Sequence, residues 1–208
     1  MRKSWYYLLF LLIVVSACGK HSTKPEKLLQ VFAESLATAT AMQSQQLELV
    51  ELRIREMAKN PAIGEIARRI EARIKRITIL TNAAQQQIKN LREQLTREQQ
   101  ANRKTTVSPD WTDKASLLYT QLALFRDSVL NADWALKTEF GSNFPLLGTA
   151  LDSLINSDKE LSEFLLNASY STAFAWLSNV EFNLIHAGWK CATYCFESFA
   201  YDGGCDSG

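Results

Sequence analysis

Residues 63–95 read IGEIARRIEARIKRITILTNAAQQQIKNLREQL, and this stretch decides the fold. In steps of seven, one position holds only apolar residues: Ile63, Ile70, Ile77, Ala84 and Leu91. The position four residues later is apolar with one exception: Ala67, Ile74, Thr81, Ile88 and Leu95. No proline interrupts the stretch, and Gly64 is its only glycine. The repeat predicts one helix about 50 Å long, with a narrow apolar stripe that other helices must cover.

Two partners can cover this stripe. One is a set of helices from the same chain, and the other is a second copy of the chain in a homodimeric coiled coil. The flanking sequence supplies further amphipathic helices, so we favour the intramolecular cover and keep the homodimer as an alternative.

The segment before the stripe predicts a second long helix, joined to the first by a tight break. From Glu26 to Met57 apolar residues recur at helical spacing. Asn60-Pro61 then interrupts the pattern, because a residue before proline avoids the helical region and proline suits a first helical turn. The two helices are expected to form an antiparallel hairpin.

The segment after the stripe predicts two more helices. Residues 101–110 are a polar linker, and Ser108-Pro109 is expected to start a helix that runs to about Val129. A second helix is expected from Pro145 to about Ala168, with Trp134, Phe140 and Phe144 as core residues before it. We therefore predict an all-α, antiparallel four-helix bundle over residues 26–170, followed by an aromatic and cysteine-rich tail over residues 171–208.

The N-terminus predicts export and lipid attachment. Arg2 and Lys3 precede an apolar run of 13 residues, which is too short to span a bilayer but suits a signal peptide. The run ends Val-Ser-Ala-Cys-Gly at residues 15–19, which resembles a bacterial lipobox. We predict a signal peptide over 1–17, lipidated Cys18, and a tether over 18–25 that leaves the chain on a periplasm-facing or outer-membrane leaflet. An ordinary signal peptide or an uncleaved anchor is the alternative.

The composition argues against a nucleic-acid partner. Residues 1–130 carry 20 Lys and Arg against 12 Asp and Glu, whereas residues 131–208 carry 3 against 10. A basic half can bind nucleic acid, but no motif of nucleic-acid-binding proteins accompanies it, and charges on long helices usually form solvated faces.

No sequence motif indicates catalysis. The chain has two histidines, and neither lies in a metalloprotease, nucleophile-elbow or phosphate-loop motif. Glu160 and Glu163 lie three residues apart, as paired catalytic carboxylates can, but an acidic solvated face is the simpler interpretation. We expect a non-enzymatic protein without a cofactor.

The cysteines of the segment 171–208 allow three interpretations. Cys191, Cys195 and Cys205 follow His186, but the spacing matches no established zinc motif. Export favours a disulfide, for example between Cys205 and either of the other two, which leaves one thiol over. Unpaired, buried thiols are the third possibility. A ligand or metal site in this segment is the alternative to a purely structural role.

The chain also resembles a known family through these residues: Glu26–Phe32 followed by Ser35-Leu36, the break at Asn60-Pro61, Ile88–Leu95, Trp134, Phe144-Pro145-Leu146, and Asp158 and Glu163 before Leu165-Leu166. Together they are similar to the N-terminal periplasmic domain of the GldM/PorM family of gliding-motility and type IX secretion proteins. The resemblance implies a dimeric, non-enzymatic helical domain that acts as an envelope scaffold. Here a lipobox stands where that family has a transmembrane helix.

Overall fold

The computed structural model describes residues 23–101, 106–141, 144 and 157–202. Within them every regular element is a helix, as the sequence predicts. The helices are α2 (Thr23–Met57), α3 (Gly64–Ala101), α4 (Trp111–Leu130), α5 (Trp134–Phe140), α6 (Asp158–Asn167) and α7 (Tyr170–Asp202). An isolated bridge between Thr106 and Ser169 is the only extended pairing in these ranges.

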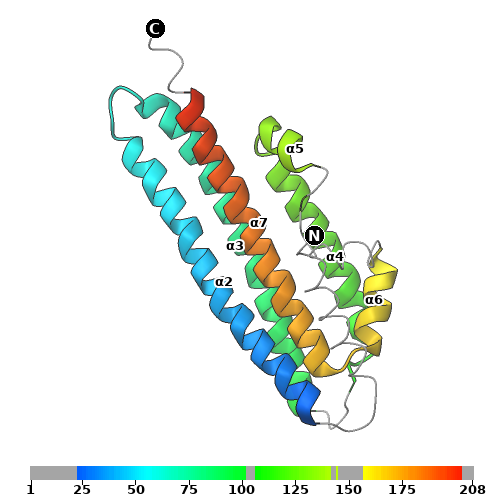
Figure 1. The fold of residues 1–208 in the computed structure, drawn as a ribbon. Coiled ribbons are helices and arrows are strands. Elements are labelled where there is room, and N and C mark those ends of the chain that lie inside the picture. The colour runs from blue at the N-terminus through cyan, green and yellow to red at the C-terminus, as the bar shows by residue number, and fades with distance from the viewer. Residues whose placement is uncertain (1–22, 102–105, 142–143, 145–156, 203–208) are drawn as a thin grey trace, which may run out of the picture.

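Three long helices lie side by side and form the body of the molecule (Figure 1). α2 and α3 run in opposite directions and are joined through Asn60-Pro61, which confirms the predicted hairpin. α7 runs beside both of them in the direction of α2 and makes the most extensive contacts in the structure. The hairpin therefore closes on α7, a helix that begins 69 positions after the end of α3.

The apolar stripe of α3 is covered by helices of the same chain. Its central residues are fully buried against α2, α4 and α7: Ala67, Ile74, Ile77, Thr81, Ile88 and Leu95. Each buried isoleucine or leucine stabilises the fold by about 1.5–3 kcal/mol relative to an exposed one. The intramolecular interpretation of this heptad repeat is confirmed.

The predicted tail is wrong over the described part of residues 171–208, which belongs to α7 in the centre of the fold. Residues on every side of α7 are buried, among them Trp176, Leu177, Leu184 and Ile185. A helix that is apolar all round is a core helix, because it has no side to turn to water. The boundary expected at residue 170 therefore does not separate a bundle from a tail.

α3 and α7 pack closely at Gly188. A Cβ atom built on this glycine would lie 2.2 Å from the Thr81 Oγ1 atom and 2.9 Å from its Cγ2 atom. Thr81 is itself fixed, because its hydroxyl donates to the carbonyl oxygen of Ile77 at 2.8 Å. The lack of a side chain at residue 188 thus sets how closely the two helices pack.

α4 and α6 form a second layer, and this arrangement differs from the expected four-helix bundle. α4 packs against α3, and α6 packs against the outer side of α4 (Figure 1). α4 begins at Trp111, three residues after Ser108, which we expected to cap it. The Ser108 hydroxyl oxygen still accepts a hydrogen bond from the Asp110 backbone N–H at 3.4 Å. α6 begins at Asp158 with Ser157 as its N-cap. Residues 145–156, where we expected the start of this helix, lie outside the described residues.

The segment expected to be irregular contains the short helix α5. The Asp133 carboxylate caps α5 by accepting a hydrogen bond from the Ala135 backbone N–H at 3.0 Å. The same carboxylate forms an ion pair with Arg73 of α3. Phe140 packs edge-on against Tyr194 of α7 with ring centroids 5.5 Å apart, and Phe144 is buried. Trp134 is 78% exposed, so its expected place in the core is wrong. It starts a helix whose inner side is formed by Leu136 instead.

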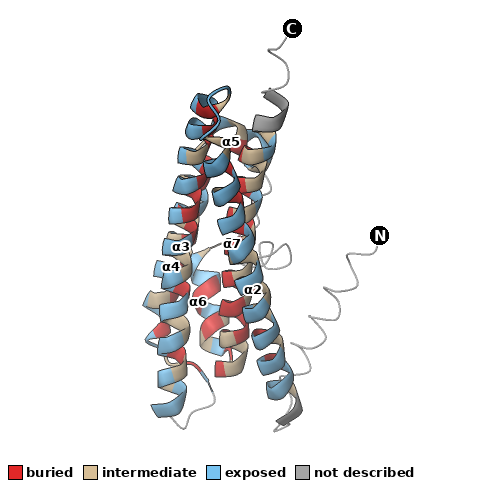
Figure 2. Cartoon of the chain, turned by 90° about the vertical axis from the view of Figure 1, so that its left-hand side faces the viewer, coloured by how far each residue is buried: buried red, intermediate tan, exposed pale blue. Residues whose placement is uncertain are grey.

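Burial is concentrated between the helices, and the outer side of α2 is exposed along most of its length (Figure 2). Among the described helices, none has an apolar stretch long enough to cross a bilayer.

Candidate functional site

The site residues predicted from sequence do not converge in the structure. Cys18 lies outside the described residues, so its lipidation stays a prediction. Glu160 and Glu163 are both exposed on α6, and Glu163 makes only a long ion pair of 3.9 Å with Lys159. Both residues therefore belong to a solvated acidic surface of α6, which is the simpler of the two interpretations given above.

Cys191 and Cys195 are free thiols buried in the core of α7, one turn apart. Cys205 lies outside the described residues, so a disulfide to it stays a prediction. His186 lies on another side of the helix and stacks on Phe182, with ring centroids 5.9 Å apart. Burial, and then the charge of Lys190, lowers the pKa of His186. Over the described ranges, no three His, Cys, Asp or Glu side chains are grouped as a metal site requires.

The two thiols are held in their protonated form. Burial raises the pKa of Cys191 to about 12, and the neighbouring Cys195 adds to the shift. Burial also raises the pKa of Cys195 to about 12, with a further contribution from Asp133. Both therefore pack as small hydrophobic side chains and are poor nucleophiles at neutral pH.

The thiols predict a loss of stability at alkaline pH. In the unfolded chain a thiol ionises near its ordinary pKa of 9.0, whereas the folded chain keeps the proton until about pH 12. The folded state then binds more protons, so the free energy of unfolding falls between these limits by about 1.4 kcal/mol per pH unit and thiol. We expect the fall in the free energy of unfolding from pH 7.5 to pH 10, measured by urea unfolding, to be about 3 kcal/mol larger for the wild type than for the Cys191→Ala/Cys195→Ala variant. Equal pH dependence of both proteins would contradict the buried, protonated state.

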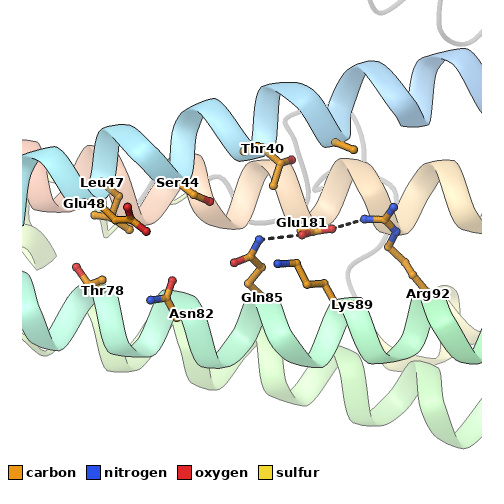
Figure 3. A pocket seen from close by; sticks show the side chains of 12 residues that line it. Thr40, Ser44, Leu47, Glu48, Thr78, Asn82, Gln85, Lys89, Arg92 and Glu181 are labelled. Carbon is orange, nitrogen blue, oxygen red and sulfur yellow. Dashed lines mark hydrogen bonds and ion pairs between the residues drawn. The ribbon is translucent and has the colours of Figure 1, made fainter.

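The most developed polar site is a pocket of about 430 Å³ between α2, α3 and α7 (Figure 3). Small side chains of α2 leave this space where large ones would fill it. The lining residues are Ala37, Thr40, Ala41, Ser44, Leu47 and Glu48 of α2, Thr78, Asn82, Gln85, Lys89 and Arg92 of α3, and Glu181 of α7. The volume is within the range of small-molecule sites in proteins, about 300–1,000 Å³.

Glu181 forms the floor of this pocket and is only 2% exposed. Its Oε1 atom accepts a hydrogen bond from Gln85 Nε2 at 2.9 Å, and its Oε2 atom accepts one from Arg92 Nη1. The Arg92 guanidinium also lies over the Phe174 ring, with 4.6 Å between Cζ and the ring centroid. A buried carboxylate is costly without such partners, so these three residues form one interdependent unit.

Two buried polar atoms beside this unit have no partner among the described residues: Thr40 Oγ1 and Arg92 Nε. Thr40 and Thr193 are the two threonines with such a hydroxyl among the described residues. The hydroxyls of Thr78, Thr81 and Thr96 each donate to the carbonyl oxygen four residues earlier, as helical threonines commonly do. Thr40 as a whole is 4% exposed, and its side chain lines the pocket instead. Nearly all buried polar atoms in proteins are hydrogen-bonded, so the Thr40 hydroxyl is one of the exceptions in the described part of this chain.

Sequence reasoning missed this site, although one signal was available. Between Tyr170 and Trp189, Glu181 is the only charged residue. A lone acid within an apolar, core-type helix requires a buried partner. The sequence does not say which of the many basic residues that partner is.

A second candidate is the outer side of α2, where exposed residues follow a heptad repeat of their own. One position holds Leu28, Ser35, Met42 and Leu49, and the other holds Val31, Thr38, Gln45 and Leu52. All eight are exposed, and the five apolar ones lie near the two ends and at the centre of the helix. We call these eight residues the α2 outer stripe.

Comparisons with family models, with curated proteins and with solved structures find no match to this chain. The resemblance to the GldM/PorM family therefore stays a prediction, and the function must be argued from the pocket and the α2 outer stripe.

Proposed function

We propose that this protein is a non-enzymatic interaction module of the bacterial cell envelope, held to the membrane by a lipid on Cys18. In this proposal it acts as a scaffold similar to the periplasmic N-terminal domain of the gliding-motility and type IX secretion family that its sequence resembles. The observation that carries the proposal is the α2 outer stripe, an apolar repeat that no described element of the chain covers.

The stripe suits one occupant in particular, the α2 helix of a second copy. Isolated exposed apolar residues are common on protein surfaces and need no explanation. Here the two heptad positions are exposed over nearly four heptads, and both are apolar in the first heptad (Leu28, Val31) and in the last (Leu49, Leu52), with Met42 between them. The polar residues in the middle, Ser35, Thr38 and Gln45, favour one register over others.

Charges next to the stripe favour a parallel pair. In the fully overlapped antiparallel register Leu28 faces Leu52 of the second copy. That register also places Glu34 near the other copy's Glu48, and Lys27 near its Arg55. Such like-charge contacts destabilise a coiled coil, whereas the parallel register pairs Glu48 with the second copy's Arg53.

The proposed lipid anchor favours the same orientation. Lipids on both copies require both α2 N-termini to lie at the membrane, which a parallel pair provides. An antiparallel pair would place one N-terminus about 50 Å from the other, the length of 35 residues of helix.

Cysteine crosslinking in intact cells tests this proposal. In a Cys205→Ser background, Leu28→Cys and Leu49→Cys are each expected to give a crosslinked dimer with a short bismaleimide, because each residue meets its own copy in a parallel pair. Gln30→Cys is the matched control, since Gln30 is exposed on α2 but lies off the stripe. It is expected to remain monomeric. Labelling of the same cells with a palmitate analogue is expected to mark the protein, and Cys18→Ala is expected to remove the label.

Different results would contradict separate parts of the proposal. Equal crosslinking at residues 28, 30 and 49 would contradict pairing through the stripe. Crosslinks from residues 28 and 49 to another protein would exclude a second copy as the occupant. An unlabelled wild-type chain would contradict the lipid anchor.

A further inference from the structure

We propose that the pocket between α2, α3 and α7 binds a short peptide with free termini, its carboxylate at Lys89 and its ammonium group at Glu48. Glu48 belongs to both proposals: a second copy whose Arg53 pairs with Glu48 would compete with the ligand's ammonium group for this carboxylate. The placement of the peptide follows from the charges that remain unpaired in the pocket, from their separation and from the orphaned Thr40 hydroxyl.

The charges at the floor of the pocket are already satisfied. Both oxygens of Glu181 accept hydrogen bonds, and Arg92 neutralises this carboxylate. Lys89 lies beside them on α3, and its ammonium group makes no ion pair or hydrogen bond with any other described residue. The surplus at this end is therefore one positive charge, which attracts a carboxylate.

The other end of the pocket has the opposite charge. Glu48 of α2 lies near Thr78 and Asn82 (Figure 3), and its carboxylate has no partner within the described part of the chain. An ammonium group is the complementary ligand group for this end. A molecule that carries both groups neutralises the pocket, whereas a simple anion or cation satisfies one end alone.

The separation of the two ends selects the length of the ligand. Glu48 lies near Thr78 and Asn82, which precede Lys89 by eleven and seven residues, so about 10–16 Å of helix axis separates the two ends. An extended chain spans about 3.3–3.6 Å per residue, so three to five residues cover this range, and a tripeptide covers its shorter limit. A single amino acid is too short to reach both charges.

The space between the ends suits a peptide backbone. Ala37 and Ala41 provide room, and the hydroxyls of Thr40 and Ser44 face the space from α2. The Thr40 hydroxyl and the Arg92 Nε group are the buried polar atoms there without a partner among the described residues. Peptide carbonyl and amide groups supply the hydrogen bonds that these atoms lack.

Isothermal titration of the purified full-length chain with trialanine tests the proposal. We expect saturable binding with a Kd of about 0.1–1 mM, the range that a ligand of this size allows. Lys89→Met and Glu48→Gln are each expected to weaken binding at least about tenfold. Both residues are exposed and unpaired with other described residues, so both variants are expected to fold. Lys75→Met, an exposed lysine on the same helix, is the matched control and is expected to bind as the wild type does.

Blocked peptides assign each terminus to its residue. N-acetyl-trialanine is expected to bind the wild type and Glu48→Gln equally, since the ammonium group is absent. Trialanine amide is expected to bind the wild type and Lys89→Met equally. Absence of saturable binding, or equal binding of trialanine to all variants, would overturn the proposal. Binding of alanine as tight as that of trialanine would overturn the two-ended placement.

Thr40→Val separates a binding role from a structural one. If the hydroxyl serves only the ligand, its removal leaves the empty protein at least as stable, because an unsatisfied buried group is lost. The same change is expected to weaken trialanine binding several-fold. If the Thr40→Val variant binds trialanine as tightly as the wild type does, the Thr40 hydroxyl does not contact the ligand.

Discussion

Truncation after Ser169 is expected to abolish cooperative unfolding of the remaining chain. It removes α7, which covers the inner sides of both α2 and α3 and carries buried residues along its whole length. The apolar sides of α2 and α3 that α7 covers then have no other partner among the described residues. A chain that keeps its helices but loses their packing forms a loosely packed state. We expect reduced far-UV helicity, a broad thermal transition and aggregation on size exclusion.

The matched control is truncation after Asp202, which retains all of α7. This shorter deletion is expected to leave the thermal midpoint within a few degrees of that of the full chain. A sharp transition after the longer truncation would show that the rest of the chain folds without residues 170–208 and would contradict the central role of α7.

Arg92→Met is expected to lower the free energy of unfolding by about 2–4 kcal/mol. The change leaves the buried Glu181 carboxylate with Gln85 alone, and an unpaired buried charge typically costs about 3–5 kcal/mol. The expected value is somewhat smaller because the Arg92 side chain is 19% exposed, so water reaches the site. Urea unfolding monitored by circular dichroism measures the difference.

Two further variants show whether the pairing itself is responsible. Adding Glu181→Met to Arg92→Met is expected to restore most of the lost stability, because both charges are then gone. Arg97→Met removes an exposed arginine of the same helix that pairs with Glu93, and its expected effect is below about 1 kcal/mol. A double variant as unstable as Arg92→Met would indicate that lost packing on Phe174, and not the unpaired carboxylate, explains the effect.

Periodicity predicted the elements well where each helix has one buried side. The α3 stripe, the break at Asn60-Pro61 and the α4 helix all follow from apolar residues three and four positions apart. The same rule failed for α7, whose residues are buried on several sides and show no polar side to mark a helix. It also does not show which side of α2 is buried, because apolar residues on both sides, the exposed Leu28, Val31 and Met42 among them, satisfy the same spacing.

The pocket was beyond prediction for a different reason. Its residues come from three helices, and Gln85 and Arg92 lie 96 and 89 positions from Glu181 in the sequence. Each of them alone is an ordinary polar residue of a long helix. Only the packing of α7 against the hairpin brings them together and excludes water from the carboxylate.

Apolar spacing along the chain is enough to predict a helical protein with two long helices joined at Asn60-Pro61 and an apolar stripe on the second. These features depend on local spacing, which acts within a few turns of helix. The tertiary structure alone decided that α7 is the central helix, that Glu181 is buried against Arg92, and that the α2 outer stripe is exposed. Which side of a helix faces a neighbour depends on contacts between distant segments, and spacing along one segment does not specify them.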